Sequence, residues 1–300
     1  MSPRSKTYTT IGYLSAFGSS LIWGVTPIYF KALAAVPPMQ VLMHRMVWSF
    51  VLLAALLCVL RRWRNWLGLM QRRRTLAIFP VTALLVSGNW LIYIWAVQND
   101  FIVQASLGYF IYPLVSVMLG VVFLRERLRP AQTGAVLLAA AGVGYLALTH
   151  GRVPWISLLL AGSFSTYALI RKVARADALE GLTVETLLMV VPASLYLVHL
   201  NRHGAAAFLH SGWATDGLLM GTALITAVPL LLFNIGAKRL PLSSLSFLQY
   251  LAPTGQFLIG VFVYDEPFST PQLIAFIFTW TALIIFTTDS VRQLRSSQDR

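Results

Sequence analysis

The chain is short of charged residues and has almost no cysteine. Only 11% of its 300 residues are Asp, Glu, Lys or Arg, against about 25% in soluble domains. The single cysteine, Cys58, excludes an intrachain disulfide. No pair of carboxylates lies inside an apolar run, and neither an H-E-x-x-H zinc motif nor a P-loop is present. These absences argue against a soluble domain, a metal centre, ATP hydrolysis and an intramembrane enzyme, and they predict no cofactor.

Long apolar runs dominate the sequence, which is 57% hydrophobic. Almost every run is about 20 residues long, the length that crosses a hydrocarbon core of roughly 30 Å. The alternating segments of about ten residues that build a β-barrel are absent. We therefore predict an all-α membrane protein with ten transmembrane helices, at 9–31, 38–60, 75–98, 103–124, 131–149, 154–171, 182–200, 215–237, 242–264 and 271–289.

The positive charges fall almost entirely on one side of this arrangement. With the N-terminus inside, 19 of the 23 Lys and Arg residues are cytoplasmic and three are outside, leaving Arg45 within a span. Cytoplasmic loops of membrane proteins carry such an excess. This distribution places both the N- and C-termini in the cytoplasm. It also explains the net charge of +13 through anionic lipid headgroups, without nucleic acid as a partner.

The chain contains an internal repeat. A shift of 140 residues gives six identities in 27 aligned positions, where composition gives roughly two: Ser106/Ser246, Pro113/Pro253, Gly120/Gly260, Val121/Val261, Glu126/Glu266 and Gln132/Gln272. Five helices separate the copies, so the second copy is inverted. We predict two inverted-topology halves, 9–149 and 154–289, as in alternating-access transporters. Pro113 and Pro253 are candidate symmetric hinges, or else static kinks.

Charged residues inside spans are the sharpest pointers to function, because each is costly unless it is paired or hydrated. We interpret Arg45 as the residue that binds an anionic group of the cargo. Glu185, or His44, is the candidate proton-coupling group, and an offset of 141 residues makes these two equivalent. The structural alternatives are a snorkelling arginine at the outer interface, a first-turn acid favoured by the helix dipole, and a packed neutral histidine.

Amide and aromatic residues in the middle of spans are the candidate walls of a binding cavity. A site for a small amphipathic molecule needs an apolar lining with a few polar groups. The alternative role for each residue is an interhelical hydrogen bond or an interface anchor. Together with Arg45 and His44, the predicted substrate-binding set comprises Trp23, Asn89, Tyr93, Tyr109, Tyr112, Tyr167, Gln249 and Tyr250.

Several strings resemble one family of carriers. They include "SLIWGVTPIYFK", "MHRMVWSF", "SGNWLIYIWAVQN", "QASLGYFIYPL", "FLRERLR" and "TAVPLLLFNIGAKRLPLSSLSFLQYLAPT". They are similar to the RarD-type permeases, EamA-domain members of the drug/metabolite transporter (DMT) superfamily, from about Ile11 to Asp289. The resemblance implies a ten-helix inner-membrane carrier with a central cavity, usually an exporter of small metabolites. It does not supply a substrate.

The sequence thus predicts a multi-pass secondary transporter of the bacterial inner membrane, not an enzyme. We expect it to export a small amphipathic metabolite or drug, amino-acid-like or amphenicol-like, with protons as the hypothesised coupling ion. The alternative is a flippase for a lipid-linked sugar or phosphate. A channel is disfavoured because no ring of charges or carbonyl filter is visible. The expected partners are the small-molecule substrate and membrane lipids, in a monomer or homodimer.

Overall fold

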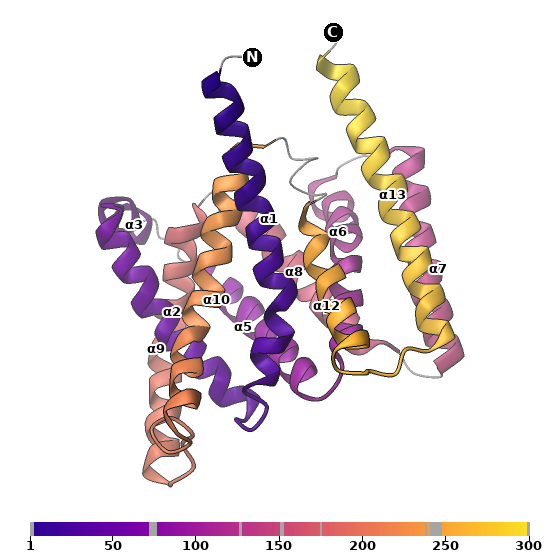
Figure 1. The fold of residues 1–300 in the computed structure, drawn as a ribbon. Helices are drawn as coiled ribbons and strands as arrows, with labels where there is room; N and C mark the ends of the chain where they lie inside the picture. The colour runs from indigo at the N-terminus through magenta and orange to yellow at the C-terminus, as the bar shows by residue number, and fades with distance from the viewer. Residues whose placement is uncertain are drawn as a thin grey trace.

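In the computed structural model the described chain forms a bundle of helices (Figure 1). The structure describes residues 3–71, 77–125, 128–150, 153–174, 176–237, 239–240 and 248–298. No β-strand occurs in these ranges. The helices are α1 (Pro3–Lys31), α2 (Pro38–Val59), α3 (Trp63–Met70), α5 (Phe79–Gln98), α6 (Ile102–Leu124), α7 (Pro130–His150), α8 (Trp155–Ala174), α9 (Ala178–Arg202), α10 (Trp213–Ala237), α12 (Leu251–Phe262) and α13 (Thr270–Gln298).

Each of the ten predicted segments falls on a helix, although several helices begin or end at other residues than predicted. Helix α9 begins at Ala178 rather than 182, because Asp177 is extended at the N-cap and the acidic Glu180 favours the first turn. Helix α1 begins at Pro3 rather than 9, α5 begins at Phe79 rather than 75, and α13 continues to Gln298 rather than 289. Helix α12 covers Leu251–Phe262, within the predicted span 242–264. Part of that predicted span, 242–247, lies outside the described residues, as do Ser246 and Glu126 of the repeat.

Helix α3 was not predicted, because the arginine-rich sequence that contains it indicated a loop. Its Trp66 and Leu69 are buried, and the rings of Trp63 and Trp66 stack with centroids 4.8 Å apart. Beside it, Arg62 forms ion pairs with Asp177 and, at 2.8 Å, with Glu180. One face of a short helix therefore packs onto the bundle, and the adjoining arginine ties it to the start of α9.

Eight described helices are long and apolar enough to cross a membrane: α1, α2, α5, α6, α7, α9, α10 and α13. Two further apolar helices are shorter, Trp155–Arg171 within α8 and Leu251–Phe262. The chain is thus a multi-pass membrane protein, and the count of ten spans stays a prediction.

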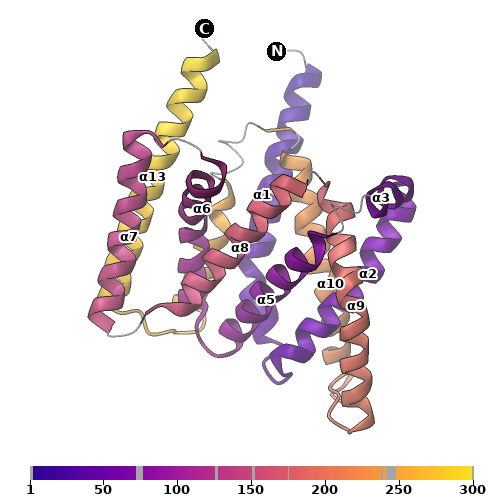
Figure 2. The ribbon, with the colours of Figure 1, turned by 180° about the vertical axis from the view of Figure 1, so that it is seen from behind.

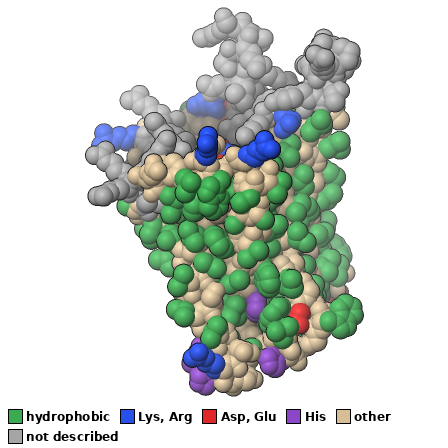
Figure 3. All heavy atoms as spheres, turned by 90° about the vertical axis from the view of Figure 1, so that its left-hand side faces the viewer, with side chains coloured by type: hydrophobic (Ala, Val, Ile, Leu, Met, Phe, Trp, Pro, Cys, Tyr) green, Lys and Arg blue, Asp and Glu red, His purple; other side chains and the backbone are tan. Residues whose placement is uncertain are grey.

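The surface of the bundle is far more apolar than that of a soluble protein. Large apolar residues point outward, as at Leu84 and Leu148, which are 67% and 85% exposed. Polar residues such as Asn89 and Gln256 are buried between the helices. Figure 3 shows a broad hydrophobic belt, with most of the visible Lys and Arg side chains at the upper end of the molecule and others of this kind, beside histidines, at the lower end. Such a surface suits lipid, since buried polar groups find partners inside the bundle.

The helices are arranged with α7 and α13 side by side at one edge and α2, α9 and α10 at the other (Figures 1 and 2). Helix α5 packs against α8, and α6 packs against both α8 and α12. The α6–α8 approach is close, because a Cβ on Gly108 would lie 2.8 Å from the backbone oxygen of Ser157. Both ends of the chain lie at the same end of the bundle (Figure 1).

Candidate functional site

Arg45 is a buried cation near the middle of the bundle. Proline at the first position of α2 costs no hydrogen bond, and seven residues later Arg45 is only 7% exposed. Its Nε donates to Oγ1 of Thr226 on α10 at 2.9 Å. Its guanidinium carbon lies 3.8 Å from the ring centroid of Trp90 on α5 and 5.7 Å from that of Phe30 on α1. Arginine commonly stacks on an aromatic face in this way.

No carboxylate of the described residues pairs with this arginine. Among the described residues, Arg45 forms no ion pair, and its one hydrogen bond is the one that Nε donates. Both Nη groups are therefore without a hydrogen-bond acceptor in this part of the chain. The burial argues against a side chain that snorkels to the interface. A buried guanidinium with a free edge is a ready site for an anion.

Two of the predicted cavity residues, Tyr93 and Tyr109, lie close enough to this arginine to interact with it electrostatically, and a third, Asn89, is bonded to Tyr109. Tyr93 and Thr26 share a hydrogen bond of 2.7 Å, and the rings of Tyr93 and Tyr109 meet edge to face at 5.7 Å. The Tyr109 hydroxyl donates to Oδ1 of Asn89 at 3.4 Å. The Asn89 amide in turn donates to the backbone oxygen of Leu160 at 3.0 Å. Helices α1, α5, α6 and α8 are thereby joined by aromatic and polar contacts around one region.

Four other predicted cavity residues lie elsewhere. Trp23 packs on Phe233 with ring centroids 6.0 Å apart, while Tyr112 packs on a phenylalanine of α8. Tyr250 stacks on a ring of α6, and Gln249 makes no hydrogen bond within the described residues. None of the four forms a hydrogen bond or ring contact with Arg45. Within the described chain they are better explained as packing between helices.

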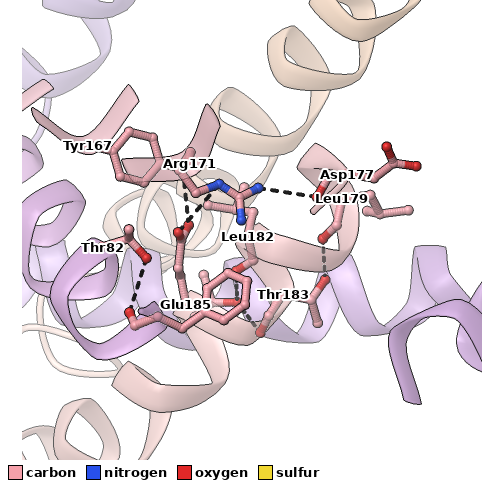
Figure 4. A network of polar contacts seen from close by, with 10 residues as sticks. Thr82, Tyr167, Arg171, Asp177, Leu179, Leu182, Thr183 and Glu185 are labelled. Atoms are coloured by element: carbon pink, nitrogen blue, oxygen red, sulfur yellow. Dashed lines mark hydrogen bonds and ion pairs between the residues drawn. The ribbon is translucent and has the colours of Figure 1, made fainter. Parts of the chain in front are cut away.

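Glu185 belongs to a second polar group, on helices α8 and α9 (Figure 4). Its side chain is 1% exposed, and Oε2 accepts a hydrogen bond of 3.1 Å from the Tyr167 hydroxyl. Oε1 lies 3.7 Å from Nε of Arg171. The sequence places Arg171 at the cytoplasmic end of the predicted span 154–171; in the structure it lies near the C-terminal end of α8, and its side chain is 12% exposed. The first-turn acid of α9 is Glu180, so Glu185 is not explained by the helix dipole.

His44 is separate from Arg45 despite being its neighbour in sequence. Its ring lies 5.0 Å from that of Phe208, in the segment that joins α9 to α10. Arg45 and Glu185 each lie seven residues after the first residue of their helices, α2 and α9. The helix starts therefore make Arg45, rather than His44, the counterpart of Glu185.

The two candidate hinge prolines occupy different places. Pro113 lies in the middle of α6, where it leaves a carbonyl free and permits a bend. Pro253 lies in the first turn of α12, where a missing N–H costs no hydrogen bond. Their symmetry as hinges is thus a prediction that the described helices do not test.

Glu266, which the repeat flagged without a role, joins the ends of two helices. Its carboxylate accepts hydrogen bonds from the backbone N–H groups of Ile102, at 2.6 Å, and Val103, at 2.8 Å. These are unpaired donors of the first turn of α6. Partial burial raises the pKa of the Glu266 carboxyl above its usual value, although the two backbone donors act in the opposite direction.

Comparison with known proteins gives a consistent answer. Residues 10–148 match the EamA-like transporter family. The chain is 46% identical to an uncharacterised transporter of Vibrio cholerae, over 94% of this chain and 93% of that one. It is 43% identical to the protein RarD of Streptomyces exfoliatus, over 96% and 92%. A solved crystal structure shares the fold with a TM-score of 0.58 at 18% identity, covering 93% of this chain and 98% of that one.

These relatives are similar to the chain over nearly its whole length. Their family consists of transporters, which move molecules rather than transform them. The apolar helices of this chain fit a membrane transporter. The chain is therefore a member of the RarD group of the EamA-like family, a multi-pass transporter of the drug/metabolite type.

Proposed function

We propose that the protein is an alternating-access exporter of a small amphipathic carboxylate, amino-acid-like in character, in the bacterial inner membrane. The observation that carries the proposal is Arg45, a buried cation without a carboxylate partner in the described chain. Such a residue is costly in a membrane and commonly marks a substrate path. The aromatic neighbours supply the apolar wall that a small amphipathic ligand needs.

The surroundings of the guanidinium favour a carboxylate over a phosphate. Trp90 covers one face of Arg45, and Nε is used by Thr226. The remaining edge offers two Nη groups, which match the two oxygens of one carboxylate. The nearby hydroxyls of Tyr93 and Tyr109 already have protein partners. A phosphate group, with three oxygens to satisfy, finds fewer donors here, which disfavours the flippase alternative.

The packing of the helices supports two inverted halves, 9–149 and 154–289. If α1, α2, α5, α6 and α7 correspond to α8, α9, α10, α12 and α13, contacts recur in exchanged form. Helix α6 packs on α8 as α12 packs on α1, and α5 packs on α8 as α10 packs on α1. Such exchange suits alternating access around a central site. Termini that share one end, near most of the Lys and Arg side chains visible in Figure 3, agree with a cytoplasmic location for both.

Proton coupling is assigned to Glu185 in this proposal. The carboxylate is buried, and it is held by groups that can release it, a tyrosine hydroxyl and an arginine beyond hydrogen-bond distance. Titratable carboxylates inside transporters commonly form proton relays. Replacing Glu185 by glutamine is expected to leave transport running but to remove its dependence on pH.

The test is ligand-induced stabilisation of purified protein in detergent. The library pairs each amino-acid derivative or organic acid with its neutral amide, and adds amphenicols and undecaprenyl phosphate. A ligand at 100 times its Kd stabilises the folded state by about 2.7 kcal/mol. We expect stabilisation by carboxylates, none by the matched amides, and loss of the effect in Arg45→Ala but not in Arg202→Ala, an exposed control. Equal responses to acid and amide contradict the proposal, and a response to undecaprenyl phosphate alone favours a flippase.

A further inference from the structure

At Gly181 a side chain of α8 reaches the backbone of α9. The guanidinium of Arg171, on α8, lies directly against the backbone of Gly181 on α9. A Cβ built on Gly181 would overlap that guanidinium. Any other residue at this position must therefore displace the arginine. No motif in the sequence assigned a role to this glycine.

Because Gly181 has no side chain, the guanidinium of Arg171 can lie against it and reach two acceptors, one at the N-cap of α9 and one within α9. Its Nη2 donates to the backbone oxygen of Asp177 at 3.2 Å, and its Nε lies 3.7 Å from Oε1 of Glu185. The guanidinium carbon is 5.5 Å from the ring centroid of Phe79 on α5. In Figure 4 the arginine spans the space between Asp177 and Glu185.

The distance between Nε of Arg171 and Oε1 of Glu185 is short enough for the two charges to neutralise each other, but it is too long for a hydrogen bond. Within the described residues, Nη1 of Arg171 and Oε1 of Glu185 make no hydrogen bond although both are buried. The titratable and charged groups that act on Glu185 are Arg171 and Tyr167, both from α8, while α5 contributes the hydroxyl of Thr82. Because the counter-ion comes from the neighbouring helix, any separation of α8 from α9 removes it.

We propose that Gly181 is a positioning residue that seats Arg171 as the counter-ion of Glu185, so that the carboxylate gains a proton when α8 moves away from α9. Glu185 takes that proton from water and returns it when the arginine is reseated. The inference deepens the proton coupling proposed above and rests on it for its role in transport. The placement of the arginine is tested separately from transport.

The experiment titrates Glu185 directly by infrared spectroscopy of the purified protein. The band of the protonated carboxyl that disappears in Glu185→Gln identifies the residue. In Gly181→Ala we expect the pH at half-protonation to rise by about 1 unit or more, since an adjacent opposite charge shifts a carboxylate by about that much. The fold is expected to survive, because the displaced group is the far end of a flexible side chain. Gly162→Ala in α8, where nothing lies within 4 Å of the added carbon, serves as the matched control.

A second variant keeps the test independent of changes in α9. Arg171→Gln removes the counter-ion without touching Gly181, and we expect the same upward shift. Adding Gly181→Ala to Arg171→Gln is expected to give no further shift, because both changes remove one interaction. An unchanged midpoint in Arg171→Gln, or a shift in Gly181→Ala that persists in full beside it, overturns the proposal.

Transport assays on the same variants separate this inference from the proposed function. In one result, Gly181→Ala shifts the titration of the Glu185 carboxyl while Glu185→Gln keeps the pH dependence of transport. That result supports Gly181 as the residue that positions Arg171 and contradicts proton coupling at Glu185. In the reverse result, Glu185→Gln loses the pH dependence of transport while Gly181→Ala leaves the carboxyl titration unchanged. That result supports proton coupling at Glu185 and contradicts the positioning role of Gly181.

Discussion

Replacing Arg45 by methionine is expected to abolish ligand binding while leaving the empty protein as stable as the wild type or slightly more so. Methionine has a similar length and an unbranched, adaptable side chain. The substitution removes the buried cation but keeps an apolar side chain in contact with the neighbouring aromatic rings. The prediction distinguishes an arginine kept for binding from one kept to hold the fold together.

The magnitude follows from three contributions at this site. A cation in the middle of a membrane helix costs about 3 kcal/mol on insertion scales. Its contact with Trp90, at 3.8 Å, returns about 2 kcal/mol for a desolvated cation–π pair. The hydrogen bond to Thr226 adds about 0.6 kcal/mol, the average for such bonds in a membrane bundle. Methionine is therefore expected to raise the free energy of unfolding by about 0.5 kcal/mol.

A structural arginine predicts a change of the opposite sign. A hydrogen bond to a charged group contributes about 1.5–3 kcal/mol, so an arginine kept for its bond to Thr226 would lower the free energy of unfolding by about that much when replaced. The assay is denaturant unfolding in detergent without ligand, for the wild type, Arg45→Met and the exposed control Arg202→Met, followed by carboxylate binding to each. A loss of 2 kcal/mol or more in Arg45→Met, or carboxylate binding that persists, would refute the reasoning.

Three further variants test other parts of the structure. Because the folded state raises the pKa of Glu266, it binds a proton more readily than the unfolded chain, so stability should rise as pH falls from neutral toward about 4.5; an unchanged slope in Glu266→Gln contradicts this. Gly142→Ala places a Cβ 2.6 Å from that of Phe278 on α13 and should cost about 1–3 kcal/mol in unfolding measurements, whereas Gly144→Ala, with nothing within 4 Å, should not. Asn89→Leu removes two donated hydrogen bonds between α5 and α8 and should lower the melting temperature, unlike a substitution on the lipid face.

The helices were predictable because each membrane span has to be long and apolar. Length and hydropathy placed all ten predicted segments on helices, and proline marked several starts. The same criterion missed α3, because a short helix such as Trp63–Met70 buries only one face and is flanked by arginines in the sequence. It also placed the start of α9 too late, since Glu180 reads as polar although Arg62 pairs with it inside the fold.

The site was only partly predictable, since a sequence shows which residues are unusual but not which ones meet. A lone intramembrane arginine is conspicuous, and so are Asn89 and Tyr93 on one helix face. Thr226 is not conspicuous, because threonines are common in membrane helices, yet it holds Arg45. Gly181 carried no signal either, since its role comes from the side chain of another helix. Contacts between segments far apart in the sequence determine which of these residues lie together, and the local sequence pattern does not show such contacts.

The charges buried within the described spans suggest how the two polar groups work together. Arg45 is positive, the ionised Glu185 is cancelled by Arg171, and the buried Glu180 is cancelled by Arg62. While Glu185 is ionised, the empty interior therefore carries one net positive charge, and a bound monocarboxylate makes it neutral. Moving one net charge through the membrane potential costs or releases about 2.3 kcal/mol per 100 mV. The loaded protein has a neutral interior, so its change between the two states does not include this energy. A dianionic phosphate would leave a negative interior, which is a second reason, independent of hydrogen bonding, to infer a monocarboxylate as the cargo.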